Sequence, residues 1–287
     1  MKISLVLATL HRKKELLQFM DSLIEANNYL NGSCQIELIL IDQNPHEFGL
    51  KLLVETYNEY YTVQYIHSSI KGLSYNRNIG LNAVNGDIIC FPDDDCLYYP
   101  ETLFSVVKFF KLNDDIDVAL GRIYDRENKA NIIKAWPKTE KVISPLNFYF
   151  LSSSITIFLR TTAVVRFDEK LGVGAKYGAC EDPDFIYRIL KNHRIYYSPL
   201  IDVWHPTPDM EAISLNKVET YSSGFGYFIR KDISMIKVLL LIMLLGKKIV
   251  QSILTNSKFV DGYFSSFYKG IFVGFFKRND KFERKSF

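Results

Sequence analysis

Short apolar runs alternate with amphipathic stretches through the first part of the chain. Apolar runs bounded by turn residues predict buried strands, and apolar positions spaced three and four apart predict helices. The strands are expected at residues 2–9, 35–42, 63–68 and 87–91, and the helices at residues 12–27, 48–60, 74–84 and 100–113. This alternation is typical of an open, largely parallel α/β sheet flanked by helices. Ser74 is expected to cap the third helix.

The pattern changes after about residue 117. Residues 117–125 and 150–167 are strand-like and longer, which predicts a mixed extension of the sheet. A glycine-rich loop leading into a helix follows at residues 170–192, and a final strand at residues 194–206. Ligands of such sheets bind at the carboxyl ends of the strands. Asp42 and the acidic residues after the fourth strand are expected at that edge.

The C-terminal region differs in composition from the rest of the chain. Residues 211–287 hold 13 Lys/Arg and 6 Asp/Glu, whereas the whole chain has a net charge of only +3. The apolar run at residues 238–245 is far shorter than the roughly 20 residues of a membrane-spanning helix. Residues 263–278 mix aromatic and basic side chains, which indicates contact with an anionic membrane surface. Helices packed on the body of the protein or in a dimer would explain the same pattern.

Three consecutive carboxylates stand out in the stretch FPDDDC, residues 91–96. Two unit charges about 4 Å apart repel by roughly 4 kcal/mol at an effective dielectric constant near 20. Asp93, Asp94 and Asp95 are therefore either solvated in a turn before a helix or arranged around a cation. Their position behind a buried strand favours the cation.

Two further features carry chemistry but have ordinary structural explanations. Asp182, followed by Pro183, is well suited to cap a helix, and it is equally well placed to point into a cleft. His205 ends a predicted strand, where it could be a metal ligand or an ordinary surface histidine. The four cysteines show no CxxC pair, so we expect reduced, mostly buried thiols.

The motif GLSYNRNIGLNAVNGDIICFPDDDC, residues 72–96, resembles the nucleotide-binding core of family-two glycosyltransferases with the GT-A fold. The stretches LILIDQNP, GAKYGACEDPDFIYRIL and YYSPLIDVWHP extend this similarity over roughly residues 1–210. The resemblance implies a Rossmann-like catalytic domain at residues 1–215. A helical, basic and aromatic extension would follow at residues 216–287.

The resemblance also implies a role for each matching residue. Asp42 matches a residue that contacts the nucleotide base, Arg77 one that faces the diphosphate, and Asp93 one on the ribose side. The donor-binding residues would be Thr9, Arg12, Asp42, Arg77, Asp93 and Asp94. The chain departs from the family pattern at residues 42–45, which read DQNP where many members read DDGS. It departs again at Asn76, where alanine is common and where a helix surface should tolerate the change.

Catalysis and metal binding are implied for four other residues. Asp95 and His205 would hold Mn²⁺ or Mg²⁺, Asp182 would be the catalytic base, and Glu181 would orient the acceptor or the loop. This predicts an inverting, metal-dependent transferase that moves a sugar from a nucleotide-diphosphate donor, such as a UDP-sugar. The acceptor would be a glycan or a lipid-linked oligosaccharide in capsule, O-antigen or cell-wall synthesis.

The expected location follows from the start and the end of the chain. The first residues carry no secretory signal, so we expect a cytoplasmic protein that binds peripherally to the inner face of the cell membrane, with no nucleic-acid partner. Two alternatives stay open. One is a non-catalytic scaffold or sugar-binding subunit with the same fold. The other is a nucleotidyltransferase, which would need a glycine-rich basic loop after the first strand, where the chain has no glycine.

Overall fold

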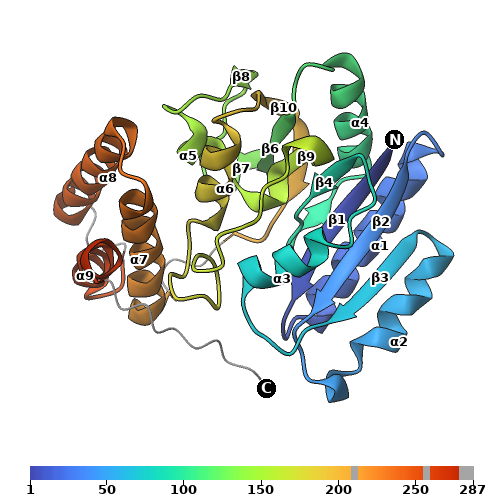
Figure 1. The fold of residues 1–287 in the computed structure, drawn as a ribbon, viewed down its shortest axis with the longest axis horizontal. Coiled ribbons are helices and arrows are strands. Elements are labelled where there is room, and N and C mark those ends of the chain that lie inside the picture. Colours follow the sequence, from blue (N-terminus) through green and yellow to red (C-terminus); the bar gives the residue numbers. More distant parts are fainter. Residues whose placement is uncertain (208–212, 255–258, 278–287) are drawn as a thin grey trace.

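The computed structural model describes residues 1–207, 213–254 and 259–277 (Figure 1). Its first half is a parallel sheet in which β1 pairs with both β2 and β4, and β2 pairs with β3. The strands are β1 (Lys2–Thr9), β2 (Gln35–Asp42), β3 (Thr62–His67) and β4 (Ile88–Cys90). The intervening helices are α1 (Lys13–Leu30), α2 (Leu50–Glu55), α3 (Leu73–Leu81) and, later, α4 (Thr102–Leu112). The predicted alternation of strands and helices is confirmed.

The second half extends the sheet with mixed strand directions. The order is β3-β2-β1-β4-β9-β6-β10-β5, in which β9 runs antiparallel to both β4 and β6. These strands are β5 (Leu97–Tyr98), β6 (Val118–Asp125), β9 (Ile157–Arg160) and β10 (Ile195–Trp204). Two short strands, β7 (Ala130–Asn131) and β8 (Lys141–Val142), pair with β6 and β10. One hydrophobic core joins both halves.

The strand expected at residues 150–167 is mostly wrong. Only β9 forms a strand, and it follows α5 (Phe148–Leu151) and lies between two short 3₁₀ turns, Ser154–Thr156 and Thr161–Ala163. Serine and threonine side chains in this stretch bond to nearby backbone groups, which favours turns over strands. The hydroxyl of Thr156, for example, donates to the carbonyl of Ser153 at 2.9 Å.

Two expected helix caps are also wrong. Helix α3 begins at Leu73 after Gly72, whose φ of 139° only glycine readily adopts, and the Ser74 hydroxyl instead donates to the carbonyl of Leu171 at 2.6 Å. Helix α6 (Glu181–Ile189) begins one residue before Asp182, because Cys180 occupies the cap position with a φ of 73°. The two carboxyl groups of Glu181 and Asp182 therefore stand together in the first turn.

Three helices form the C-terminal region at one side of the sheet (Figure 1). They are α7 (Leu215–Lys231), α8 (Met235–Leu254) and α9 (Tyr263–Phe276). Helices α7 and α9 pack backbone to backbone, since a side chain at Gly226, Gly270 or Gly274 would overlap the other helix. In the described part of the chain, no helix is both long enough and apolar enough to cross a membrane. All four cysteines are unpaired and three are buried, as expected.

Candidate active site

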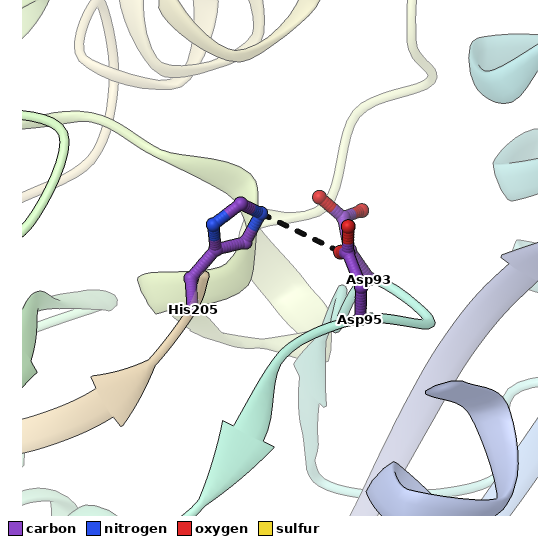
Figure 2. Close-up of side chains that lie close together, drawn as sticks. All are labelled: Asp93, Asp95 and His205. Carbon is purple, nitrogen blue, oxygen red and sulfur yellow. Dashed lines mark ion pairs between the residues drawn. The ribbon is translucent and has the colours of Figure 1, made fainter. Parts of the chain in front are cut away.

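Asp93, Asp95 and His205 meet at the carboxyl edge of the sheet. The aspartates lie directly after β4 and the histidine directly after β10, and one ligand atom from each lies within 4.8 Å of the other two (Figure 2). The Nδ1 atom of His205 is 2.7 Å from the carbonyl of Pro206, so this nitrogen can donate there and leave Nε2 free. Nε2 is 3.4 Å from Oδ1 of Asp95. Two carboxylates and an imidazole suit a divalent cation such as Mn²⁺.

The three aspartates at residues 93–95, called the acidic loop from here on, have different partners. Asp94 accepts a hydrogen bond from the Thr9 hydroxyl at 2.8 Å and pairs with Arg12 at 3.1 Å, and Arg12 also pairs with Asp95. Burial raises the pKa of Asp94 to about 6, although Thr9 and Arg12 oppose the shift. Burial also acts to raise the pKa of Asp95, but His205 and Arg12 outweigh it and lower this pKa. The loop therefore carries carboxyl groups of unequal acidity.

Arg77 joins the acidic loop to the first turn of α6. Its guanidinium is completely buried, and Nη2 lies 2.7 Å from Asp93 and 3.0 Å from the hydroxyl of Ser154. Nη1 lies 3.6 Å from Oδ1 of Asp182. Burial raises the pKa of Asp93, although the Arg77 charge opposes this. One cation thus neutralises two carboxylates from distant parts of the sequence.

The two carboxyl groups in the first turn of α6 have different surroundings. Oδ2 of Asp182 accepts a hydrogen bond from the backbone N–H of Ser154 at 2.8 Å, while its buried Oδ1 has no hydrogen-bond partner among the described residues. Burial, together with the charge of Asp182, raises the pKa of Glu181, which favours its protonated form. Neighbouring carboxyls in different surroundings can divide the roles of base and hydrogen-bond donor.

A cavity of about 1180 Å³ opens over these groups. One wall consists of the acidic loop with Arg12, His205 and the start of α6, and the opposite wall comes from α7 and α8. Lys217, Tyr221 and Lys247 belong to that second wall. A cavity of this size admits a nucleotide sugar together with part of an acceptor.

Three predicted site residues, Thr9, Asp42 and Arg77, do not line the cavity. Thr9 and Arg77 contact Asp94 and Asp93 of its wall, whereas the side chain of Asp42 is bonded elsewhere. Its two oxygens accept hydrogen bonds from Asn44 and from the Tyr65 hydroxyl, and it is almost fully buried. Its neighbour Gln43 lines the cavity instead. Asn76, which we expected on a helix surface, is completely buried and donates to Gln43 at 2.8 Å. The two places where the chain departs from the family pattern, Asn76 and the DQNP stretch, are therefore in direct contact.

Sequence reasoning missed Ser154 and the lysines of the second wall. Ser154 contacts both Arg77 and Asp182, yet nothing in the run of serines at residues 152–154 singles it out. Lys217 lies on α7, a helix that the apolar pattern did not predict. A basic surplus was evident in this region, but the sequence did not place it at the cavity.

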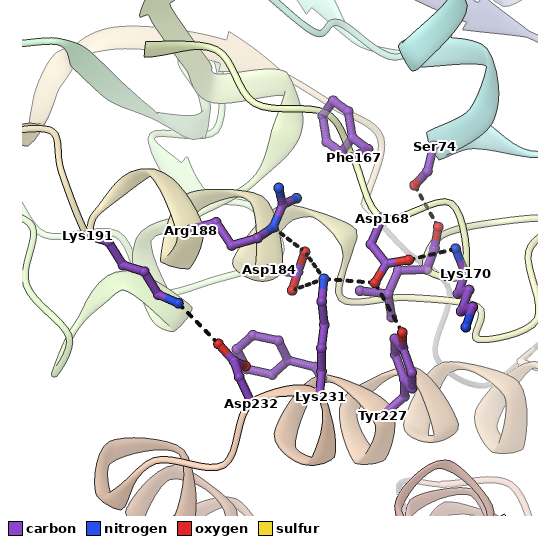
Figure 3. Close-up of polar contacts among 12 residues, drawn as sticks. Ser74, Phe167, Asp168, Lys170, Asp184, Arg188, Lys191, Tyr227, Lys231 and Asp232 are labelled. Atoms are coloured by element: carbon purple, nitrogen blue, oxygen red, sulfur yellow. Dashed lines mark hydrogen bonds and ion pairs between the residues drawn. The ribbon is translucent and has the colours of Figure 1, made fainter. Parts of the chain in front are cut away.

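A charge network around the buried Asp184 holds α6 against α7 (Figure 3). Lys231 of α7 lies 2.7 Å from Asp168 and 2.9 Å from Asp184 of α6. Asp184 also accepts from Nε of Arg188 at 2.8 Å, and Asp168 accepts from the Tyr227 hydroxyl at 3.2 Å. Since Asp184 lies two residues after Asp182, this network fixes the helix that carries the candidate base.

Comparisons with known proteins agree with this architecture. The chain resembles the crystal structure of S. aureus TarS residues 1–349, with a TM-score of 0.62 and 17% identity over 93% of this chain and 90% of that one. TarS is also known in complex with UDP-GlcNAc. A mannosyltransferase from Pyrobaculum calidifontis, in complex with GDP-Man and Mn²⁺, matches with a TM-score of 0.63 and 11% identity over 96% of this chain and 87% of that one.

Sequence comparison gives the same result. An uncharacterized glycosyltransferase of Methanocaldococcus jannaschii is 25% identical over 121 residues, a match that spans 42% of each protein. The model of glycosyl transferase family 2 matches residues 4–172, which is more than half of the chain. The chain therefore has the GT-A fold and belongs to glycosyl transferase family 2.

Proposed function

We propose that the protein is an inverting, metal-dependent glycosyltransferase that uses a nucleotide-diphosphate sugar, with UDP as the nucleotide. The observation that carries this proposal is the position of Arg77, which contacts Asp93 of the acidic loop and Asp182 of α6 at once. This contact brings a candidate metal site and a candidate base to one cavity. TarS, a protein of the same fold, is described in complex with UDP-GlcNAc.

The donor would bind at the acidic wall of the cavity. Asp93, Asp95 and His205 would hold Mn²⁺ or Mg²⁺, which supports a metal requirement. When bound, the ion would offset negative charge on the leaving diphosphate. Arg12, which lines the cavity beside these carboxylates, would contribute positive charge to the same diphosphate.

Asp182 would act as the base. Its Oδ2 is held by the N–H of Ser154, and its Oδ1 lies beside Arg77. The carboxylate lines the cavity, where it would take the proton of an acceptor hydroxyl as this hydroxyl attacks the anomeric carbon. Protonated Glu181 can donate a hydrogen bond that orients the acceptor. A single base without a sugar-carrying nucleophile gives one displacement, and therefore inversion.

The acceptor would be a glycan or a lipid-linked oligosaccharide used in surface polysaccharide synthesis. The basic second wall of the cavity, with Lys217 and Lys247, supports an acceptor that carries negative charge. Synthesis from cytoplasmic nucleotide sugars would place the protein at the inner face of the cell membrane, bound peripherally.

The test is release of free nucleotide from a panel of UDP- and GDP-sugars. We expect Mn²⁺-dependent release of UDP that EDTA abolishes. Asp182→Asn should reduce release by about a thousandfold or more while donor affinity stays within a few fold. The matched control, Asp115→Asn on the exposed surface, should behave as wild type. Tight UDP binding with no release from any sugar would instead identify a non-catalytic binding subunit.

A further inference from the structure

The outer face of α8 carries a continuous stripe of exposed, large apolar side chains. At about 100° per residue, these positions fall within an arc of about 140° along the whole helix. Each is between 49% and 76% exposed. The outer stripe consists of Met235, Leu239, Ile242, Met243, Ile249, Val250, Ile253 and Leu254.

The inner face of α8 fixes the direction in which the outer stripe points. Lys237 is completely buried and donates to the carbonyl of Phe228 in α7 at 2.7 Å. One helical turn later Leu240 is buried, and near the other end Lys248 donates to the Tyr263 hydroxyl of α9 at 3.0 Å. Figure 1 shows α8 on the side of α7 that faces away from the sheet. The outer stripe therefore cannot turn inward without breaking these contacts.

The charge around the outer stripe indicates what covers it. Helices α8 and α9 together contain four lysines and no acidic residue. Lys247 is exposed at the edge of the outer stripe. A second copy of the chain, paired symmetrically through this face, would bring lysines toward lysines. An anionic lipid surface would accept the apolar side chains and pair with the lysines as well.

We propose that α8 lies along the interface of an anionic lipid bilayer, with its outer stripe among the acyl chains. Leu244, Lys247 and Lys248 of the same helix line the cavity, so this orientation places the cavity directly behind the membrane-bound helix. Taken with the proposed function, on which this part rests, the acceptor is an amphipathic, lipid-borne saccharide whose anionic head group meets Lys247.

The test is co-sedimentation of the full chain with vesicles, in EDTA and without nucleotide, so that binding is measured apart from catalysis. We expect binding to phosphatidylcholine–phosphatidylglycerol vesicles that is stronger than to phosphatidylcholine alone and weaker at high salt. The triple variant Ile242→Asp, Ile249→Asp, Ile253→Asp should bind about tenfold more weakly or worse. The controls Leu52→Asp and Leu112→Asp place the same change at exposed leucines of α2 and α4, and should bind as wild type.

Circular dichroism and UDP affinity establish that the triple variant is folded. Equal vesicle binding by the folded triple variant and wild type would overturn the proposal, as would no binding by wild type. A wild-type dimer that the triple variant converts to a monomer, without vesicle binding, would assign the outer stripe to a second copy. Vesicle binding with no nucleotide release would leave this inference standing and reject the proposed catalysis.

Discussion

The link between α7 and the catalytic helix can be tested at Lys231. Replacing it by methionine keeps most of the apolar stem but removes the charge between Asp168 and Asp184. Removing one partner of a buried ion pair typically costs about 3–5 kcal/mol. Here Asp184 keeps its bond from Arg188 and Asp168 keeps its bond from Tyr227. Since the Lys231 side chain is also 26% exposed, we expect a loss below that range, about 2–3 kcal/mol of unfolding free energy.

Urea unfolding followed by circular dichroism measures this loss. With a slope of about 3 kcal/mol/M, the midpoint of Lys231→Met should fall by about 0.7–1 M. Lys269→Met is the control, because Lys269 of α9 pairs with Glu219 of α7 at 2.8 Å on the exposed surface. That exposed pair should contribute about 0–1 kcal/mol.

Activity measurements distinguish a role of Lys231 in positioning α6 from a role in stability alone. If the charge network fixes α6, then Lys231→Met should lower kcat for nucleotide release several fold at a temperature where it is folded, with UDP affinity nearly unchanged. The reasoning is refuted if Lys231→Met and Lys269→Met cost the same unfolding free energy. It is also refuted if kcat stays at the wild-type value.

Three further outcomes follow from the structure. Gly274→Ala should lower the free energy of unfolding in urea by about 1–3 kcal/mol, because its methyl group would overlap the backbone at Ser223. Gly246→Ala, on the open face of α8, should instead raise the free energy of unfolding by about 0.5–1 kcal/mol. Because the pKa of Glu181 is raised in the folded state, the folded state should lose stability as pH rises from the ordinary carboxyl pKa toward the raised one. Glu181→Gln should lack this loss and should be more stable than wild type at the upper end of that range; an unchanged pH profile contradicts this. His205→Asn should weaken Mn²⁺ binding in calorimetric titration by about tenfold or more, and unchanged affinity would remove His205 from the metal site.

The sequence predicted best the elements whose apolar residues are buried on both faces. Strands β1 and β2 have the predicted bounds, because nearly every residue in them is buried and a polar residue stands at each end of the apolar run. Helix α7 lies in the predicted helical extension at residues 216–287, but its own bounds were not predicted. Its interior contains Gly224 and Gly226, each of which lowers helix propensity by about 1 kcal/mol relative to alanine. The structure uses both for close contact, with Ala179 and with α9, and this packing gain is invisible in a single sequence.

The candidate site likewise contains residues that the sequence predicted and residues that it did not. Position behind a strand indicated the acidic loop, and the resemblance to a family supplied residues from three distant segments that the structure brings together. No sequence pattern could indicate that Ser154 would hold Asp182, since that contact depends on how the loop before β9 folds. Asp42 stays a predicted contact of the nucleotide base, although its two oxygens already have partners within the protein.

The three aspartates of the acidic loop point alternately to two sides and do not form one cluster of charge. Asp93 and Asp95 turn toward His205, while Asp94 is held between Thr9 and Arg12. Each carboxylate thus has a cationic neighbour, since Arg77 contacts Asp93 and Arg12 contacts both others. The repulsion among three adjacent charges is therefore partly offset before any ligand binds. A cation at Asp93 and Asp95 is therefore favoured because these residues offer ligand oxygens in a suitable arrangement. The folded loop does not require the cation for its own stability.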